Sequence, residues 1–467
     1  MTARSGDEQV QLKVIIVGAG IGGLLLAILL EKIGLDYDIF ERSKEVRPLG
    51  SIMSIGPNIL PVIEQLGLLD DLLKFSFPVP TLNIYNEDMS HVGTTSFEAF
   101  KERGGYDFLA FSRPDFHHLL LSQIPSHKLH LGKKVLSLLQ GDRGAMIRTS
   151  DGKTHEGDIV VGADGAHSAI RQCLYDRLAE ENKLPRSDST NLDLGYNCMV
   201  GVATGLDSEI YPGLKDGHAH FCTTVAYNVP HSWRIFMVPG NRICWSVSVQ
   251  ITLNEGKTQA MRNSEWGPEA IEDMVKLVAH HKVPVGGTLG DLIEATPKDL
   301  ISKVVLEEKM FETWYHDRTV LLGDACHKMM PSAGQGACNA MQDAVILANC
   351  LFDLQSGSIE DITAAFKSYK NQRYPQASAQ FKISQQVGKI FYGHSFTERM
   401  IRYAILNWAP KSLESGNFVK AYSYRPQAVF LPQVEDRGLF KALPQHESRR
   451  MKACEEAAKS QRQPQPL

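Results

Sequence analysis

The chain has 467 residues, of which 43% are hydrophobic and 22% are charged, and its formal net charge is −4. This length predicts two or three domains, and the lack of a basic excess argues against a nucleic-acid-binding protein. The eight cysteines form no C-x-x-C and do not cluster with histidines, so we expect no metal site and no disulfide framework. That pattern is typical of a reduced, cytoplasmic setting. The longest apolar run, 24–30, is too short to cross a membrane, and the N-terminus lacks the apolar core of a signal peptide.

The first predicted element is a buried strand over 13–17, followed by a glycine-rich turn, a helix over 24–33 and a second strand that ends in Glu41. Three glycines form the G-x-G-x-x-G fingerprint of this turn: Gly18, Gly20 and Gly23. Such glycines allow a tight turn, close approach of a pyrophosphate and close packing of helix on strand. Glu41 lies 18 residues after Gly23, where a carboxylate can accept hydrogen bonds from ribose hydroxyls. The unit therefore predicts a dinucleotide such as FAD or NAD, and disfavours NADP.

A loop containing glycine and proline follows at 47–58, where the chain could pass over a ligand, and Ser54 lies within it. We expect a helix after this loop, through Leu66. Arg113 stands at a later junction between a strand and a helix. At that position, contact with a phosphate or a ribityl chain and an ordinary solvated arginine are equally compatible with the sequence.

The segment 158–171 reads as an apolar strand, an acid-glycine turn at Asp164 and a helix start. Taken alone it would be a β-turn built on Asp-Gly. As a further acid at a strand-turn-helix junction, Asp164 is expected to belong to the same nucleotide site.

From about 185 to 300 the sequence alternates between apolar and polar residues, most clearly at 232–238 and 243–249, which a Pro-Gly-Asn turn joins. This pattern predicts a hairpin within an antiparallel sheet that has aromatic residues on one face. Three aromatic side chains belong to that prediction: Trp233, Phe236 and Trp245. They either line an apolar pocket or form the core beneath the sheet.

A third strand-turn-helix junction begins with the apolar run 318–322 and continues through Asp324 to a helix that starts at Gly336 and Ala337. Asp324 could cap a helix or bind a ligand. Backbone N–H groups at the later helix start could stabilise negative charge. A second long helical region is expected from 364 to beyond 392.

Together these motifs resemble the group A flavoprotein monooxygenases, the p-hydroxybenzoate-hydroxylase-like family. The glycine fingerprint, the segment 158–171 and the segment 323–343 stand in the order typical of that family. The segment 424–432 further resembles the fungal secondary-metabolism branch, which includes meroterpenoid and alkaloid epoxidases.

The expected fold is α/β: a Rossmann-like FAD-binding domain, an inserted, mostly antiparallel substrate domain, and a helical C-terminal region. The expected divisions are 1–80, 105–182 and 305–395 for the FAD-binding domain, 81–104 and 183–304 for the substrate domain, 396–445 for a helical extension and 446–467 for a flexible tail.

The resemblance implies one FAD per chain, with NAD(P)H as a co-substrate that docks without a Rossmann domain of its own. It places Glu41 on the adenosine ribose, Arg113 near the pyrophosphate and Asp324 on ribityl or pyrophosphate oxygens. Ser54 is expected where the family loop, more often with glycine, meets the flavin, and Ala337 at the isoalloxazine edge. Asp164 belongs to a motif that touches both FAD and NAD(P)H. The remaining expected cofactor contacts are Gly18, Gly20, Gly23 and Gly336.

The implied activity uses NAD(P)H and O2 to hydroxylate or epoxidise a hydrophobic or aromatic small molecule through a flavin C4a-hydroperoxide. Tyr196 and Tyr227 are the candidates for handling a proton. Some relatives place an arginine near Asn197, which this chain lacks; Arg234 could replace it or be a solvated strand residue. We expect His327 to position the loop rather than to catalyse.

Two alternatives remain at this level. The first is an FAD-dependent reductase or oxidase on the same scaffold, which would not insert oxygen. The second is a flavin-bearing interaction module, although the chain ends soon after the flavin fold. We expect a monomer or a homodimer.

Overall fold

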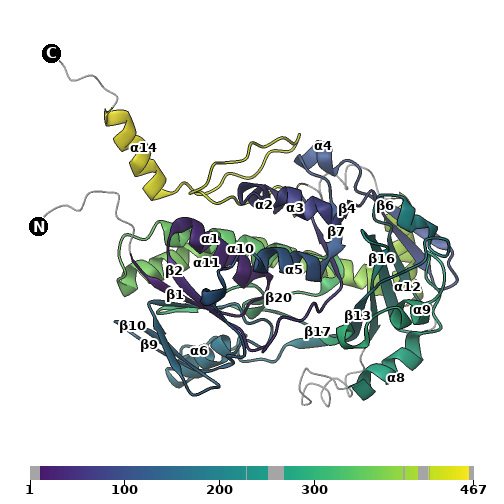
Figure 1. The fold of residues 1–467 in the computed structure, drawn as a ribbon, viewed down its shortest axis with the longest axis horizontal. Coiled ribbons are helices and arrows are strands. Elements are labelled where there is room, and N and C mark those ends of the chain that lie inside the picture. The colour runs from purple at the N-terminus through teal and green to yellow at the C-terminus, as the bar shows by residue number, and fades with distance from the viewer. Residues whose placement is uncertain are drawn as a thin grey trace, which may run out of the picture.

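The computed structural model describes residues 11–227, 229–250, 268–392, 395–408, 419 and 421–461. Two large sheets lie at opposite ends of its long axis, with the N-terminal strands at one end and the strands around β13 and β16 at the other (Figure 1). This arrangement is the mixed α/β fold that the sequence predicts. None of the helices in the described ranges has both the length and the apolar character needed to span a bilayer.

The first sheet is mostly parallel and is buried on both faces. Its strands, in hydrogen-bonded order, are β18 (Tyr315–His316), β19 (Thr319–Leu321), β12 (Ile159–Gly162), β1 (Lys13–Val17), β2 (Asp36–Phe40) and β8 (Leu129–His130). The last four residues of β1 are apolar and buried, as is typical of a strand that helices cover on both faces. One of the neighbouring helices is α1 (Ile21–Ile33), which packs on α10 (Gly336–Phe352). Parallel pairing brings the carboxyl ends of β1, β12 and β19 to one edge.

The second sheet has eight strands and is mostly antiparallel. In hydrogen-bonded order these are β20 (His327–Lys328), β17 (Ser302–Met310), β13 (Asp193–Ala203), β16 (Arg242–Gln250), β15 (His231–Val238), β14 (Phe221–Val225), β5 (Thr81–Asn86) and β6 (His91–Ser96). The predicted hairpin is confirmed, since β15 and β16 pair antiparallel from His231 with Val249 to Val238 with Arg242. The short strand β20 ties the segment after Asp324 to this sheet.

The prediction that the sheet aromatics share one face is wrong for Phe236. Trp233 and Trp245 are buried together in one core, where their indole N–H groups donate to the Lys282 carbonyl and the Thr296 hydroxyl. Phe236 lies three residues after Trp233, an odd interval, so its side chain points to the opposite face. There it stacks on Phe221, with ring centroids 3.8 Å apart. The two tryptophans therefore belong to the core beneath the sheet.

Two small sheets complete the β-structure: β3 (Ile52–Ile55), β7 (Leu109–Ser112) and β4 (Ser76–Pro78) form one, and β11 (Thr154–Gly157), β10 (Gly144–Thr149) and β9 (Val135–Gly141) form the other. The strand β3 interrupts the loop expected at 47–58. It forms because Met53 and Ile55 are buried while the backbone of residues 52–55 pairs with β7.

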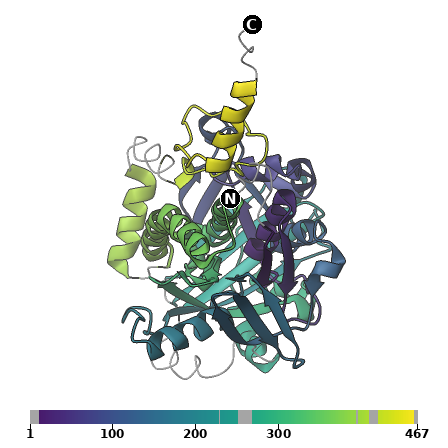
Figure 2. The ribbon, with the colours of Figure 1, turned by 90° about the vertical axis from the view of Figure 1, so that its left-hand side faces the viewer.

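The remaining helices mentioned below are α2 (Leu60–Gln65), α5 (Arg113–Leu121), α6 (Ala169–Glu180), α8 (Pro268–Val278), α9 (Leu289–Glu294), α11 (Ile359–Tyr392), α12 (Phe396–Trp408) and α14 (Arg449–Gln461). Figure 2 shows α11 and α12 on one side of the molecule and α14 projecting from the top.

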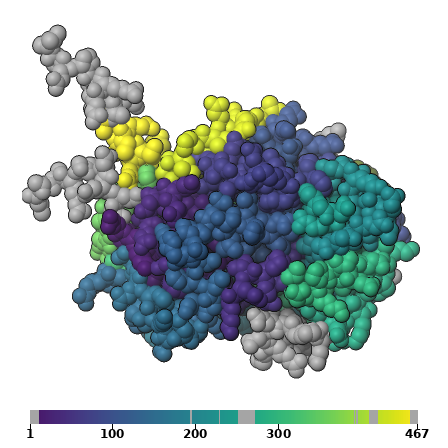
Figure 3. Space-filling view, in the orientation of Figure 1, coloured from purple at the N-terminus to yellow at the C-terminus, as the bar shows by residue number. Residues whose placement is uncertain are grey.

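The C-terminal segment runs over the N-terminal half of the chain, where it forms the upper surface in Figure 3. Arg437 pairs with Glu64 of α2, and the Gln65 amide donates to the Ala428 carbonyl at 3.1 Å. Residues 449–461, which we expected in a flexible tail, form α14. This stretch is rich in Ala, Glu, Lys and Arg, which favour helix, and the Ser448 hydroxyl accepts a hydrogen bond from Met451 N at its start.

Candidate functional site

The glycine turn after β1 and the turn after β12 touch directly. Ala163 N donates to Val17 O at 2.8 Å, and Leu322 N, from the third segment, donates to Gly162 O at 3.0 Å. A Cβ on Gly18 would lie 2.4 Å from Ala163 O, and Gly18 has φ +108°, so only glycine fits there. The three segments of the sequence motifs therefore meet at one edge of the parallel sheet.

Of the other two fingerprint glycines, Gly23 is tightly packed and Gly20 faces open space. A Cβ on Gly23 would lie 2.2 Å from Gly18 O, which keeps α1 tight against the turn. A Cβ on Gly20 would meet no protein atom within 4 Å, although Gly20 immediately precedes the N-terminus of α1. Free N–H groups at a helix start with open space in front of them suit a phosphate. This part of the site fits the pyrophosphate of FAD.

Glu41 follows β2 directly and lies beside the same turn. Its Oε2 accepts from Ala19 N at 3.0 Å, and its Oε1 accepts from Ser43 N at 2.9 Å. Each carboxylate oxygen can accept a further hydrogen bond. The position is compatible with the expected ribose contact, which stays a prediction.

Arg113 and Asp324 come together from α5 and from the turn η4 (Gly323–Ala325). Burial lowers the pKa of Arg113, and the nearby charge of Asp324 opposes that shift. Arg113 also donates from Nη1 to Leu49 O at 2.9 Å, which ties it to the loop before β3. The pair presents a cation and an anion at the sheet edge, as expected for contacts with pyrophosphate and ribityl oxygens.

Lys328 is a member of this group that the sequence analysis missed. Its Nζ lies 2.6 Å from Asp324 Oδ2. Burial alone would lower the pKa of Lys328, but the Asp324 carboxylate outweighs it and the pKa is raised. The four-residue spacing from Asp324 is the only sequence signal that could have suggested the pair. The lysine reduces the negative charge that Asp324 presents to a bound phosphate.

Asp164, in the turn after β12, accepts hydrogen bonds from backbone N–H groups at the start of α6. Its Oδ2 accepts from Ala169 N at 2.7 Å and from Ile170 N at 3.3 Å. Burial raises the pKa of Asp164, while the Ser168 hydroxyl and then the backbone N–H donors oppose the shift. Its Oδ1 is buried and has no hydrogen-bond partner within the described part of the chain. An orphaned buried acceptor is costly, and a donor on a bound cofactor would satisfy it.

Behind the site, Asp343 of α10 holds the third segment in place. Its Oδ2 accepts from Gly323 N at 3.0 Å and lies 2.6 Å from His327 Nε2. Its Oδ1 accepts from Arg373 Nε at 2.7 Å, and the side chains of Asp343, His327 and Arg373 are all fully buried. Burial alone would raise the pKa of Asp343, but His327 and Arg373 outweigh it and lower the pKa. In this network His327 positions the chain, and Arg373 is a partner that the sequence did not reveal.

The loop 329–335 leads from β20 to α10, whose first two residues are expected flavin contacts. Gly334 has φ +65°, and a Cβ there would lie 3.6 Å from the Ser54 hydroxyl, so Ser54 is brought against this loop. Gly336 and Ala337 open α10, and a Cβ on Gly336 would meet no protein atom within 4 Å. The loop is anchored from behind, since the Ser384 hydroxyl of α11 donates to Met330 O at 2.6 Å.

One face of the eight-stranded sheet covers this loop. Arg234 of β15 donates from Nη1 to Pro331 O at 3.0 Å, so it is paired and is not a solvated strand residue. The ring of Tyr196 packs against that of Tyr392 in a tilted arrangement, with ring centroids 4.6 Å apart. Both tyrosines belong to an apolar cluster, which we call the roof cluster: Tyr196, Cys198, Val200, Leu306, Met330 and Tyr392. Burial raises the pKa of Tyr196 to about 12, with smaller contributions from Tyr392 and two glutamates.

Tyr227, the second candidate for handling a proton, lies in the bend after β14. Its ring lies under Arg399 of α12, with the guanidinium carbon 4.9 Å from the ring centroid. Its ring contact is with α12, whereas Tyr196 belongs to the roof cluster with Met330 of the loop 329–335. Of the two tyrosines, Tyr196 is therefore the one that the structure places against the loop 329–335, through Met330.

Comparisons with known proteins agree with this geometry. The family described as "FAD binding domain" matches residues 11–235 and 248–384. The FAD-dependent monooxygenase esdpE of Penicillium shearii is 30% identical over 430 residues, which cover 88% of this chain and 86% of that protein. The FAD-dependent monooxygenase ausM of Penicillium brasilianum is 30% identical over 446 residues, or 92% of this chain and 90% of that protein.

Among solved structures, Klebsiella pneumoniae HpxO complexed with FAD and uric acid superimposes with a TM-score of 0.72 at 23% sequence identity. The match covers 89% of this chain and 97% of that one. The structure of 2,6-dihydroxypyridine-3-hydroxylase from Arthrobacter nicotinovorans gives a TM-score of 0.65 at 19% identity, over 83% of this chain and 95% of that one. At these identities the likeness establishes the shared fold.

Proposed function

Since this chain belongs to the FAD-binding-domain family of FAD-dependent monooxygenases, we propose that it uses NAD(P)H and O2 to hydroxylate or epoxidise a hydrophobic or aromatic small molecule. The observation that best supports the proposal is that the roof cluster packs against the loop 329–335, since Met330 of that loop is one of its members. An apolar ceiling above the cofactor loop selects an apolar substrate.

The residues at the sheet edge would hold FAD in the following way. The N-terminus of α1 beside Gly20 takes the pyrophosphate, and Glu41 takes the adenosine ribose. Arg113 and Asp324 take pyrophosphate and ribityl oxygens, and the N-terminus of α10 at Gly336 and Ala337 favours negative charge near the flavin ring. When bound, FAD supplies the redox chemistry that activates O2 at the expense of NAD(P)H.

The protein contributes position, dryness and charge. Arg234 of β15 donates a hydrogen bond to Pro331 of the loop. This contact holds the roof cluster at a set distance from the loop. The apolar side chains of that cluster exclude water, which strengthens the remaining polar contacts. We infer that this exclusion limits the loss of reducing equivalents to hydrogen peroxide.

Tyr196 is the better candidate of the two tyrosines for contact with the substrate. With a pKa of about 12 its phenol is protonated at neutral pH, so it can donate a hydrogen bond to a substrate oxygen and is a poor general base. We propose this donor role for Tyr196. Tyr227 contacts Arg399 of α12 and is not a member of the roof cluster, so it is the weaker candidate.

The relatives esdpE and ausM come from Penicillium species. We therefore propose that this enzyme acts in fungal secondary metabolism, in the cytoplasm. Whether it acts as a monomer or as a homodimer stays a prediction of the sequence.

Labelled oxygen tests the reaction. The purified flavoprotein is incubated with NADPH or NADH, ¹⁸O2 and a panel of apolar, ring-bearing metabolites, and the products are analysed by mass spectrometry. The proposal predicts one ¹⁸O atom per product molecule and substrate-stimulated consumption of NAD(P)H. A product that forms equally well without O2 would support the reductase or oxidase alternative and contradict oxygen insertion.

A further inference from the structure

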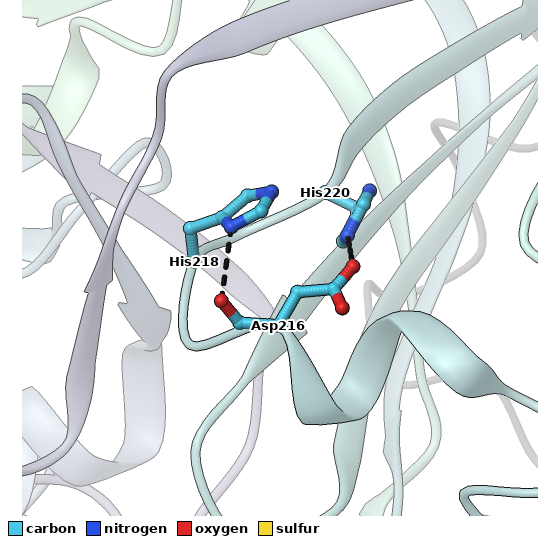
Figure 4. A group of neighbouring side chains, drawn as sticks. All are labelled: Asp216, His218 and His220. Atoms are coloured by element: carbon cyan, nitrogen blue, oxygen red, sulfur yellow. Dashed lines mark hydrogen bonds and ion pairs between the residues drawn. The ribbon is translucent and has the colours of Figure 1, made fainter.

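The turn just before β14 of the eight-stranded sheet brings together three side chains that have no role in the proposed flavin chemistry. Asp216, His218 and His220 each offer a ligand atom, and these atoms lie within 4.8 Å of one another. Figure 4 shows the carboxylate and the two imidazoles converging ahead of β14. Two imidazoles and one carboxylate form a donor set typical of Zn²⁺ and its neighbours among the divalent transition metals.

The local backbone places these donors on one side. Gly217 has φ +67° and turns the chain after Asp216. Ala219, between the two histidines, is buried, and its N–H donates to Pro78 O at 2.9 Å. In an extended segment, side chains two residues apart lie on the same side of the backbone. Because the Ala219 side chain points into the protein, the imidazoles of His218 and His220 both point outward. The two rings lie with centroids 4.7 Å apart.

The hydrogen bonds of His218 prepare it as a ligand. Its Nδ1 lies 3.1 Å from the Asp216 carbonyl oxygen (Figure 4). A carbonyl can only accept, so Nδ1 carries the proton and Nε2 keeps a free lone pair in the neutral ring. A hydrogen bond from the second ring nitrogen to a carbonyl is the usual way in which proteins orient a metal-binding histidine.

Asp216 and His220 already face each other. Asp216 Oδ2 lies 2.6 Å from His220 Nε2, and both side chains are partly exposed, which leaves a path for an ion. The neighbouring Lys215 pairs with Glu209, so it does not occupy the Asp216 carboxylate. A tetrahedral ion with bonds of about 2.0–2.1 Å holds its ligand atoms roughly 3.3 Å apart. Small side-chain rotations would bring the three donors to that spacing.

We propose that Asp216, His218 and His220 bind one divalent transition-metal ion of the Zn²⁺ class, with water in the remaining position. On binding, the ion replaces the proton on His220 Nε2, which moves to Nδ1 of the same ring. The ion fastens the turn 216–220 to the start of β14 and takes no part in the flavin reaction. This inference departs from our expectation, based on cysteine spacing, that the chain has no metal site.

The other group of possible ligands in the described residues does not support a metal. Cys326, His327 and Asp343 are also close together. However, Asp343 already accepts hydrogen bonds from Gly323 N and Arg373, and all three members of the group are fully buried. That group belongs to the network that holds the third segment.

The test titrates ZnCl2 into the holoenzyme, purified without a histidine tag and stripped with a chelator, in an isothermal titration calorimeter. The proposal predicts one Zn²⁺ per chain. It predicts that His218→Ala and His220→Gln each weaken binding by more than tenfold, whereas His127→Ala, which removes an exposed histidine elsewhere, leaves it unchanged. Flavin content confirms that each variant is folded.

A second measurement uses thermal unfolding. Zn²⁺ should raise the melting temperature of the wild type and of His127→Ala, because an ion that binds only the folded state stabilises it. It should have little effect on His220→Gln. Absence of Zn²⁺ binding by the wild type, or binding that both site variants retain in full, would overturn the proposal.

Discussion

Arg234 Nη1 donates a hydrogen bond to the carbonyl oxygen of Pro331 at 3.0 Å, and this contact joins the eight-stranded sheet to the loop 329–335. A second donor of the same guanidinium lies 3.5 Å from Ser332 O. The same side chain lies over the ring of Tyr392, 5.4 Å from its centroid. One arginine thus contacts both the loop 329–335 and the roof cluster.

The first prediction concerns this arginine. Arg234→Met should keep FAD bound but reduce the amount of oxygenated product formed per NAD(P)H roughly tenfold, because a charge-assisted hydrogen bond to the loop is lost. Arg234→Lys should retain part of the coupling, since it keeps the charge but loses the planar fork. Product and hydrogen peroxide are measured together. Wild-type coupling in Arg234→Met would contradict the role.

The second prediction concerns the open space at Gly20. Gly20→Val should fold normally, because a Cβ at Gly20 meets no protein atom within 4 Å, yet its dissociation constant for FAD should rise roughly tenfold or more as the side chain enters the pyrophosphate position. Gly141→Val is the matched control, since a Cβ there also meets nothing within 4 Å, but Gly141 contacts Arg318 just before β19, at the opposite end of the strand from Asp324. Equal FAD affinity in both variants would place the pyrophosphate elsewhere.

The third prediction concerns Asp343. Asp343→Asn should lower the free energy of unfolding by roughly 3–5 kcal/mol, because Arg373 would be left buried without its counter-charge. Asp71→Asn, which breaks an exposed pair with Lys74, should have no measurable effect. Chemical denaturation followed by circular dichroism measures both. An Asp343→Asn protein as stable as the wild type would show that the network does not hold the fold together.

The fourth prediction concerns pH and His281. His281 is buried, stacks on Trp233 and lies 2.9 Å from His231 Nδ1 through its Nε2. Burial, followed by the neighbouring His280 and His231, lowers its pKa from 6.5 to about 4. The folded state therefore binds fewer protons than the unfolded state between these values. Its contribution to stability is complete above pH 6.5 and is lost as the pH falls toward 4.

The measurement for this prediction is the melting temperature from pH 7 to pH 4.5. The wild type should lose stability steeply over that range, and His281→Gln should show a shallower slope because its side chain does not titrate. His127→Gln, at an exposed position, should follow the wild type. Parallel curves for the wild type and His281→Gln would refute the assignment.

The convergence of three distant segments could be predicted because each is a local pattern. Every one of them combines an apolar strand, a turn with glycine or acid and a helix start, and parallel pairing forces their ends together. Alternation with period two likewise predicted the hairpin of β15 and β16. The same period, applied to Trp233 and Phe236, would have shown that they face opposite sides.

The residues that the sequence did not reveal depend on contacts across the fold. Arg373 reaches Asp343 from thirty residues away in the chain, and Arg234 reaches Pro331 from ninety-seven away. No spacing rule links such pairs, because side-chain directions follow only from how the elements pack. Lys328 was within reach of sequence reasoning, but four-residue spacings between acids and lysines are too common to single it out.

The central claim is that the segments around Gly20, Asp164 and Asp324 enclose one FAD. The most direct measurement is the molar ratio of FAD to polypeptide in the purified protein, after incubation with excess FAD and gel filtration. The account predicts one FAD per chain and a yellow protein. A colourless protein that retains its circular dichroism spectrum and takes up no FAD would contradict it.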